Sequence, residues 1–372
     1  MIGSPLRVDD AGRARLSHTH PGPLIAALLL AIFGLLTIHS ASAELASSLL
    51  PRQATFLALG LICLGVVFLI DYHRLIDLAP FLYAGALVLL VLTLFIGHEV
   101  KGARSWLLIG PMRLQPAEFT KLATALLLAR VLARGDQPYL DLRRLLQAGA
   151  IVAVPALLIA AQNDLGSTAM FAAMAATMVL VAGVRPRLLA ALVLLGAIGA
   201  GLFWQFGMQP YQRSRIVSFL NAEQDPLGAG YQVRQSKIAV GSGMFWGRGY
   251  LQGTQSQLRF LPERSSDFIM AVLAEEWGFA GVAVVLGLYG LYIGSGVRIA
   301  LRSRDRLGML LVAGLLALFS FHVLYNTAMV VGLLPITGIP LPFLSHGGSF
   351  MMMNFLAVAL ILGIDHRRYV NR

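Results

Sequence analysis

Ten long stretches of mostly apolar residues alternate with polar segments along the chain. A helix needs about 20 such residues to cross the hydrocarbon core of a bilayer, and each stretch has close to that length. They span residues 23–41, 54–70, 78–97, 115–134, 145–161, 165–183, 187–206, 267–296, 307–333 and 347–364. The pattern predicts an all-α, polytopic integral membrane protein with about ten transmembrane helices.

The composition excludes a soluble globular protein. Of the 372 residues, 57% are hydrophobic and 13% are charged, and the mean hydropathy is +0.74; such values are typical of membrane proteins. The sequence therefore predicts one membrane domain over 1–372, with a tail at 1–22 and one large polar loop at 207–266. Any chemistry must use side chains on the spans, in this loop or in the shorter loop 98–114.

Lys and Arg are unevenly distributed between the two sides. If the N-terminus is inside, 17 of the 29 cations face the cytoplasm, 11 lie outside and Lys121 falls within a span. Cytoplasmic loops carry this kind of excess, so we expect both termini in the cytoplasm and 207–266 outside. Seven outer cations lie in 207–266 alone. They reflect either the tolerance of long loops for charge or a negatively charged ligand.

One carboxylate stands where the large polar loop meets the eighth apolar stretch. Asp267 directly follows Ser265 and Ser266, whose hydroxyls are predicted to cap the next helix. Asp267 would then lie in the first turn, at the aqueous mouth of a transmembrane helix. This position makes it the leading candidate for a catalytic residue.

A charge inside an apolar stretch costs about 2.5–3.5 kcal/mol on insertion, and four such residues stand out as candidates for a site. Glu118 and Lys121 are three residues apart, so they share a helix face and are predicted to neutralise each other. This pair either orients a helix or shapes a substrate cavity. Glu275 and Glu276 point about 100° apart on a helix and cannot both face one cavity. One of them pairs with a cation of another span, or the stretch marks a helix kink or a partly wet interior.

The outer loops combine cations with aromatic and amide side chains. Arg binds phosphate oxygens through two parallel hydrogen bonds, and Lys meets them as a point charge. The predicted substrate-binding residues are Lys101, Arg104 and Trp106 in the first loop and Arg213, Arg215, Gln235 and Lys237 in the second. Anionic lipid headgroups are the alternative partner, and Trp106 alone is typical of a membrane-interface anchor. Either way the expected ligand carries phosphate.

The segment 335–349 contains three prolines and three glycines between two spans. Irregular backbone at membrane depth is tolerated only where it is buried in protein or lines a wet cavity. His346 in this segment is expected to be a satisfied hydrogen-bonding residue rather than a ligand. The single cysteine, Cys63, lies in the second span, so neither a disulfide nor a thiolate metal site is predicted.

Taken together, these segments resemble the SEDS family (shape, elongation, division and sporulation) over nearly all ten spans. The resemblance rests on residues 101–106, 115–121, 164–167, 231–236, 260–268 and 337–343. It implies a peptidoglycan glycosyltransferase of the bacterial inner membrane that polymerises lipid II on the outer face. It also implies a class B penicillin-binding protein and other elongation-complex proteins as partners, and Asp267 as the essential carboxylate. The residues at 337–340 are closer to the elongation branch of the family than to its division branch.

The chain departs from the family pattern at two places. Ser265-Ser266 replaces the usual His-Thr before the aspartate, and His346 stands where Tyr is usual. Neither departure removes a proposed catalytic group. They affect how the rim of the site is hydrogen-bonded.

The chemistry of such a transfer needs few groups. Asp267 would take the proton of a sugar 4-hydroxyl as general base, while the pyrophosphate leaves as an anion that Arg and Lys stabilise. A glycosidase needs a second carboxyl group because its leaving group must be protonated, and this reaction does not. A single displacement would convert an α-linked donor into a β-1,4 glycan, with Glu118 and Lys121 shaping the cavity floor. No metal ligand is predicted, and one rim carboxylate leaves open whether Mg²⁺ or Mn²⁺ assists.

Two other functions remain open. A lipid II flippase would show broken spans in matching halves of the chain, and the break at 334–349 has no clear counterpart in the first half. A non-catalytic membrane scaffold would explain the spans but not a charged outer rim. Membrane lipids are expected partners, and nothing in the sequence indicates nucleic acid binding.

Overall fold

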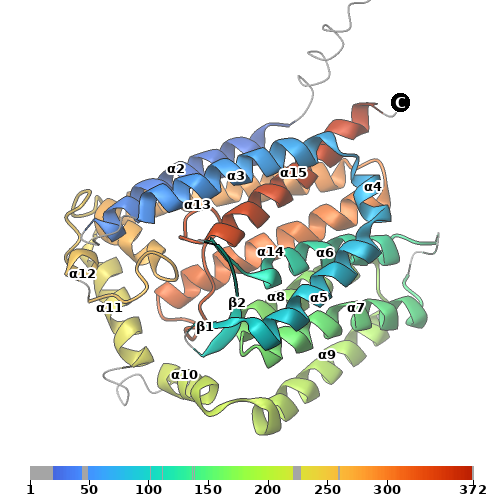
Figure 1. Cartoon of the computed structure of the whole chain (residues 1–372), viewed down its shortest axis with the longest axis horizontal. Helices are drawn as coiled ribbons and strands as arrows, with labels where there is room; N and C mark the ends of the chain where they lie inside the picture. The colour runs from blue at the N-terminus through green and yellow to red at the C-terminus, as the bar shows by residue number, and fades with distance from the viewer. Residues whose placement is uncertain are drawn as a thin grey trace, which may run out of the picture.

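The computed structural model describes residues 20–370, apart from 44–48, 101, 111, 136, 138, 221–227 and 259. Long helices run roughly along one direction and form a bundle, with the short helix α4 (Tyr72–Asp77) at one end and further short helices towards the other (Figure 1). The long helices are α2 (Gly22–Ser42), α3 (Leu49–Leu69), α5 (Ala79–Ile96), α6 (Pro116–Leu132), α7 (Leu142–Ala161), α8 (Leu165–Ala182), α9 (Pro186–Leu202), α13 (Ile269–Leu301), α14 (Arg306–Val330) and α15 (Gly348–Val370).

Each predicted apolar stretch corresponds to one of these helices. Within the described part of the chain, nine helical segments are long and apolar enough to cross a membrane. The tenth, α6, has 17 residues and is therefore about 25 Å long, close to the thickness of a hydrocarbon core. The predicted all-α, polytopic class is confirmed.

Helix α6 lies at the centre of the bundle. It packs against α5, α7, α8 and α14, and most of its side chains are buried, including Glu118 and Lys121. Around it, α3 packs along α15, and α2 along α13 (Figure 1). Helix α9, in contrast to α6, has no buried residue. The helix that carries this charged pair is thus largely enclosed by protein.

The loop predicted at 98–114 forms a small antiparallel sheet that the sequence analysis did not anticipate. Its strands are β1 (His98–Val100), β2 (Ala103–Ile109) and β3 (Met112–Leu114), paired in the order β1-β2-β3. Gly102 and Gly110 have positive φ angles of 80° and 59°, which glycine adopts without strain. The sheet connects α5 to α6 and places Trp106 opposite His98.

The large loop predicted at 207–266 is mostly helical. A π-helical turn, η1 (Phe203–Gly207), ends α9, and α10 (Pro210–Leu220), α11 (Ala229–Ser242) and α12 (Thr254–Gln257) follow. Helix α11 packs against both α13 and α14. This segment is therefore part of the packed structure at one end of the bundle (Figure 1).

Helix α13 is interrupted at Gly278, whose φ of 63° and ψ of −165° are not helical. The segment after α11 fills the break with backbone hydrogen bonds in both directions. These run from Arg248 N to Glu275 O (2.9 Å), Gly249 N to Glu276 O (3.0 Å), Phe279 N to Met244 O (2.9 Å) and Ala280 N to Phe245 O (3.0 Å). The helix kink considered for this stretch is confirmed.

We predict that Gly278→Ala destabilises the fold. A Cβ atom there would collide with Gly247 N and Phe245 O, and the φ/ψ region is essentially restricted to glycine, so the cost is about 1–3 kcal/mol. The melting temperature of the purified protein in detergent should fall. Gly287→Ala in the same helix is the control, because nothing lies within 4 Å of its added Cβ. Equal melting temperatures for the two variants would show that the break is not strained.

Candidate active site

Asp267 is half-buried in a tight turn immediately before α13. The prediction that it lies in the first helical turn is wrong by a small margin, because the helix begins at Ile269. Three consecutive carbonyl groups of this turn accept hydrogen bonds from elsewhere in the chain. His346 N donates to Ser265 O (2.8 Å), Ser345 Oγ donates to Ser266 O (2.6 Å), and Asn326 Nδ2 donates to Asp267 O (2.8 Å). The backbone that carries the carboxylate is fixed from two other segments.

The serines before Asp267 do not cap the helix, contrary to the prediction. The N-cap residue is Phe268, without a side-chain hydrogen bond. The Ser266 hydroxyl instead donates to Glu263 Oε2 at 3.0 Å, because the chain folds back on Glu263, whose carbonyl accepts from Ser266 N and Phe268 N. The Ser266 side chain stabilises the turn rather than the helix end.

The segment between α14 and α15 folds over this turn. Ser345 Oγ accepts from Leu341 N at 2.8 Å while it donates to the Asp267 turn, and Phe343 is buried against aromatic rings of three helices. Gly338 faces the carboxylate, since a Cβ there would lie 3.7 Å from Asp267 Oδ2. Much of this irregular backbone is buried in protein, one of the two predicted possibilities.

Glu118 and Lys121 form the predicted ion pair. Lys121 Nζ donates to Glu118 Oε1 at 2.8 Å, and both side chains are buried. The same ammonium lies 3.4 Å from His322 Nε2 and 3.4 Å from Met170 Sδ. The pair therefore connects α6 to α8 and α14. Its proposed role as a cavity floor stays a prediction.

A hydrogen-bonded path leads from this ion pair to Asp267. His322 Nδ1 lies 2.9 Å from Pro340 O, so Nδ1 carries the proton and Nε2 faces the Lys121 ammonium as an acceptor. One helical turn further, Asn326 Nδ2 donates to Ile339 O at 2.7 Å as well as to Asp267 O. The sequence analysis missed His322 and Asn326. Their signal was two polar residues four apart in an otherwise apolar stretch.

The first group of predicted phosphate-binding residues lies at the small sheet and on α10. Lys101 is outside the described residues. Arg104 is exposed, and its Nη1 donates to Leu94 O at 3.4 Å, while Trp106 is half-buried on β2. Arg213 Nη2 donates to Trp204 O and Gln205 O at 2.8 and 2.7 Å, and Arg215 is half-buried on the same helix. The Arg104 and Arg213 guanidiniums thus hold backbone carbonyls.

The second group lies on α11. Gln235 is half-buried and Lys237 is exposed, and the Lys237 side chain lies against Gly332, just beyond α14. Ser236 Oγ donates to Val330 O at 2.8 Å and fixes this helix to α14. Lys237 therefore stands beside the start of the segment that covers the Asp267 turn.

Among the described residues, Glu275 binds groups of α12 and Glu276 binds a group of α2, rather than a Lys or Arg. Glu275 accepts hydrogen bonds from Thr254 Oγ1 and from the N–H groups of Gln255 and Ser256, at 2.8–3.2 Å. Glu276 accepts from the Ser40 hydroxyl on α2. Glu275 thus fastens α12 to α13, and Glu276 joins α13 to α2.

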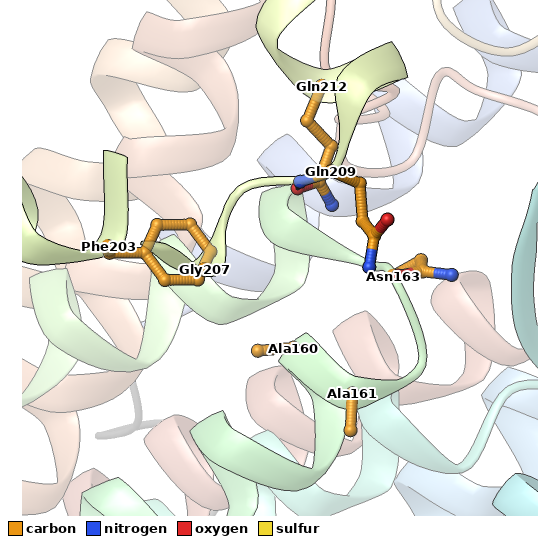
Figure 2. Close-up of a pocket in the computed structure, with 7 residues that line it drawn as sticks. All are labelled: Ala160, Ala161, Asn163, Phe203, Gly207, Gln209 and Gln212. Carbon is orange, nitrogen blue, oxygen red and sulfur yellow. The ribbon is translucent and has the colours of Figure 1, made fainter. Parts of the chain in front are cut away.

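A cavity of about 250 Å³ lies where α7 ends and α10 begins. Figure 2 shows Gln209 and Gln212 on one side of it, Phe203 beside them and two alanines opposite. Its lining residues are Ala160, Ala161, Asn163, Phe203, Gly207, Gln209 and Gln212. Two of the lining carboxamides are hydrogen-bonded to the backbone. Gln212 Oε1 accepts from Gln209 N at 3.0 Å, and Asn163 Nδ2 donates to Gly102 O at 3.2 Å. This cavity does not include Asp267.

The fold and site define a polytopic membrane protein with a fixed carboxylate at the end of a transmembrane helix. A family model described as cell cycle protein, FtsW/RodA/SpoVE, matches residues 22–370. The chain belongs to this family, which confirms the resemblance inferred from the sequence.

Individual relatives match along nearly their whole length. Peptidoglycan glycosyltransferase MrdB of Escherichia coli is 39% identical over 356 residues, covering 95% of this chain and 96% of that protein. Stage V sporulation protein E of Bacillus subtilis is 37% identical over 358 residues, with 93% and 97% covered.

Two solved structures share the fold. One is a chain from work on the structural coordination of polymerization and crosslinking by a peptidoglycan synthase complex, with a TM-score of 0.81 and 30% identity over 94% of this chain and 98% of that chain. The other is the rod shape determining protein RodA of Thermus thermophilus, with a TM-score of 0.70, 27% identity and the same coverage.

We predict that Lys121→Met strongly destabilises the protein, because it leaves the Glu118 carboxylate buried without its partner. Breaking a buried pair in this way costs about 3–5 kcal/mol. The double variant Glu118→Gln/Lys121→Met should recover most of the melting temperature, since no uncompensated charge remains. A double variant less stable than Lys121→Met alone would mean that the two residues do not act as a pair.

Proposed function

We propose that this chain is a peptidoglycan glycosyltransferase that polymerises lipid II on the outer face of the bacterial cytoplasmic membrane. The observation that carries the proposal is Asp267, a half-buried carboxylate on a turn whose three carbonyls are held by His346, Ser345 and Asn326. The names of the relatives, peptidoglycan glycosyltransferases MrdB and RodA, support the same reaction.

Asp267 acts as the general base. It accepts the proton of the acceptor's 4-hydroxyl, whose oxygen attacks the anomeric carbon of the lipid-linked donor. The bond between that carbon and the pyrophosphate oxygen breaks, and the electron pair leaves with the pyrophosphate. One displacement inverts the anomeric centre, so an α-linked donor gives a β-1,4 glycan. A rigid turn favours this step because catalysis depends on holding the base in a reactive geometry.

The described residues do not form a metal site of their own. Among the described residues, no three His, Cys, Asp or Glu side chains are close enough to hold a metal ion. We therefore assign no step to Mg²⁺ or Mn²⁺. Basic side chains of the outer segments, Lys237 among them, stabilise the negative charge of the departing pyrophosphate.

The interrupted helix α13 is the feature that most favours a flippase, the second candidate. Transporters place broken helices in matching halves of the chain. In the part that the structure describes, the helices of the first half show no such interruption, and the break in α13 is filled by the chain's own backbone. The fixed Asp267 turn favours chemistry over transport.

A class B penicillin-binding protein is the proposed partner, together with other proteins of the elongation complex. The similar chain from a peptidoglycan synthase complex supports this assignment. Polymerisation and crosslinking act on the same strand, so a transpeptidase beside the outer face would receive the glycan as it forms.

We predict that both termini lie in the cytoplasm and that the segment 207–266 lies outside. The exposed residues Gln137, between α6 and α7, and Gln252, after α11, mark opposite sides. In a Cys63→Ala background, Gln252→Cys should react with a membrane-impermeant maleimide in intact cells. Gln137→Cys should react only after permeabilisation. The reverse pattern would overturn the topology and the proposed mechanism with it.

We predict that Asp267→Asn abolishes most glycan formation while the protein still inserts. The amide keeps the shape but cannot accept a proton, so the rate should fall by roughly 10²–10⁴, the contribution of a positioned base. The measurement is polymerisation of labelled lipid II in liposomes, beside co-purification with the penicillin-binding partner. Near-parental polymerisation by a variant that still co-purifies would remove Asp267 from the mechanism.

A further inference from the structure

The cavity where α7 ends and α10 begins has no role in the reaction described above. Its volume of about 250 Å³ is below the roughly 300–1,000 Å³ of pockets that enclose a drug-sized ligand. It is therefore large enough for one small part of a larger substrate. Two of the residues that line it, Ala161 and Gln209, are exposed, so a ligand can enter the cavity from outside the protein.

The lining of this cavity is apolar on one side and rich in amides on the other. A carboxamide offers two N–H donors and one carbonyl acceptor without a net charge, and none of the lining residues is charged. The cavity therefore suits a neutral ligand that has an apolar part, a donor and an acceptor, and it does not suit a phosphate. The apolar part consists of Ala160, Ala161 and Phe203, and the carboxamides are those of Asn163, Gln209 and Gln212 (Figure 2).

Gln209 is the lining residue with an unused side chain. Among the described residues, none hydrogen-bonds to its carboxamide, which extends towards Asn163 in Figure 2. The walls beside it are fixed, because Gln212 Oε1 accepts from Gln209 N and Asn163 Nδ2 donates to Gly102 O. His346 Nε2 also lacks a partner in the described part of the chain, but His346 does not line this cavity. Since Nε2 is buried, the expectation that this histidine is fully satisfied is wrong.

Hydrogen bonds connect the cavity to the segment that covers the Asp267 turn. Asp164, the neighbour of Asn163, accepts from Gln115 Nε2 at 3.1 Å. The N–H of Gln115 donates in turn to Ser349 Oγ at 3.0 Å, and Ser349 lies at the start of α15, directly after the covering segment. The cavity and the carboxylate are therefore parts of one connected structure at the same end of the helices.

We propose that this cavity binds the acetamido group of an N-acetylated sugar in the growing glycan strand. This inference rests on the proposed function, whose substrate carries acetamido groups on its sugars. The acetyl methyl group packs on Ala160 and Ala161, and Phe203 offers its apolar face to the sugar ring. The Gln209 carboxamide pairs with the N–H and the carbonyl of the acetamido group.

The sugar in this cavity is not the one that reacts. None of the lining residues is among those that hold the Asp267 turn, so the bound sugar is a unit further along the strand. A strand that is held here stays on the protein between successive additions. The cavity therefore controls how long the strand grows before it dissociates, rather than the rate of each addition.

The first test measures the length of the glycan products. Gln209→Leu removes the amide, and Ala161→Leu fills the cavity from an exposed position. With purified protein, its partner and labelled lipid II, both variants should make strands roughly two- to tenfold shorter, the effect of one lost neutral hydrogen bond on strand dissociation. The initial rate of lipid II consumption should stay near the parental value, which a general loss of structure would not allow.

The matched control is Gln205→Leu. Gln205 is exposed in the same π-helical turn as Phe203 and does not line the cavity, so this variant should make strands of parental length. Parental lengths for both cavity variants would overturn the proposal, as would equal shortening by Gln205→Leu.

A binding measurement separates this site from the proposed reaction. Tetra-N-acetylchitotetraose is titrated onto the protein in phosphatidylcholine nanodiscs, beside cellotetraose, which has hydroxyl groups in place of the acetamido groups. The parent should bind the N-acetylated sugar roughly tenfold more tightly, and Gln209→Leu and Ala161→Leu should lose this difference. A parent that does not discriminate between the two sugars, or variants that discriminate as the parent does, would overturn the proposal.

The remaining outcomes of the same measurement are also distinct. If Ala161→Leu displaces a co-purified phospholipid and leaves chitotetraose binding unchanged, the cavity holds an acyl chain and the proposal is overturned. If the parent binds chitotetraose through Gln209 but forms no glycan from lipid II, the sugar site stands and the proposed function fails.

Discussion

A backbone carbonyl inside a membrane protein must find its hydrogen-bond donor within the protein, because the hydrocarbon offers none. Around Asp267 this constraint is met by side chains and backbone from distant segments: Asn326 of α14, and Ser345 and His346 before α15. The carbonyls of the turn are therefore paired and the turn is also immobilised. The same donors that make irregular backbone tolerable here fix the geometry that a general base requires.

The break in α13 follows the same rule. Interrupting a helix leaves carbonyls and N–H groups without intrahelical partners, and the segment 244–249 supplies both kinds of group. Glycines at the contact allow the two backbones to approach closely, since a Cβ on Gly247 or Gly278 would meet the opposite main chain. Just before this break, the Glu275 side chain binds the next short helix, α12, and the Glu276 side chain binds α2. This end of the bundle is thus joined to its core through paired backbone rather than apolar packing alone.

Patterns within one helix were predictable from the sequence, and contacts between helices were not. Hydropathy located the ten helices because length and apolar content are local properties, and the spacing of Glu118 and Lys121 predicted their ion pair. The serine cap failed because the chain before α13 folds back on Glu263. The cations were hard to assign because charge alone does not reveal that Arg213 holds the end of α9. Asn326 contributes to the site through hydrogen bonds to Asp267 and Ile339, which lie 59 and 13 positions away in the sequence.

The buried ion pair of Glu118 and Lys121 helps to orient the site. Lys121 is costly in an apolar bundle, yet its ammonium contacts Glu118, His322 and Met170 from three helices. Its position next to His322 sets which ring nitrogen carries the proton, and that proton is then directed to Pro340 O. A charge in α6 thereby orients the segment that contacts Asp267 through Asn326 and Ile339. Replacing the pair with apolar residues would preserve packing but remove this orientation, so the ion pair is better explained by the geometry of the site than by stability.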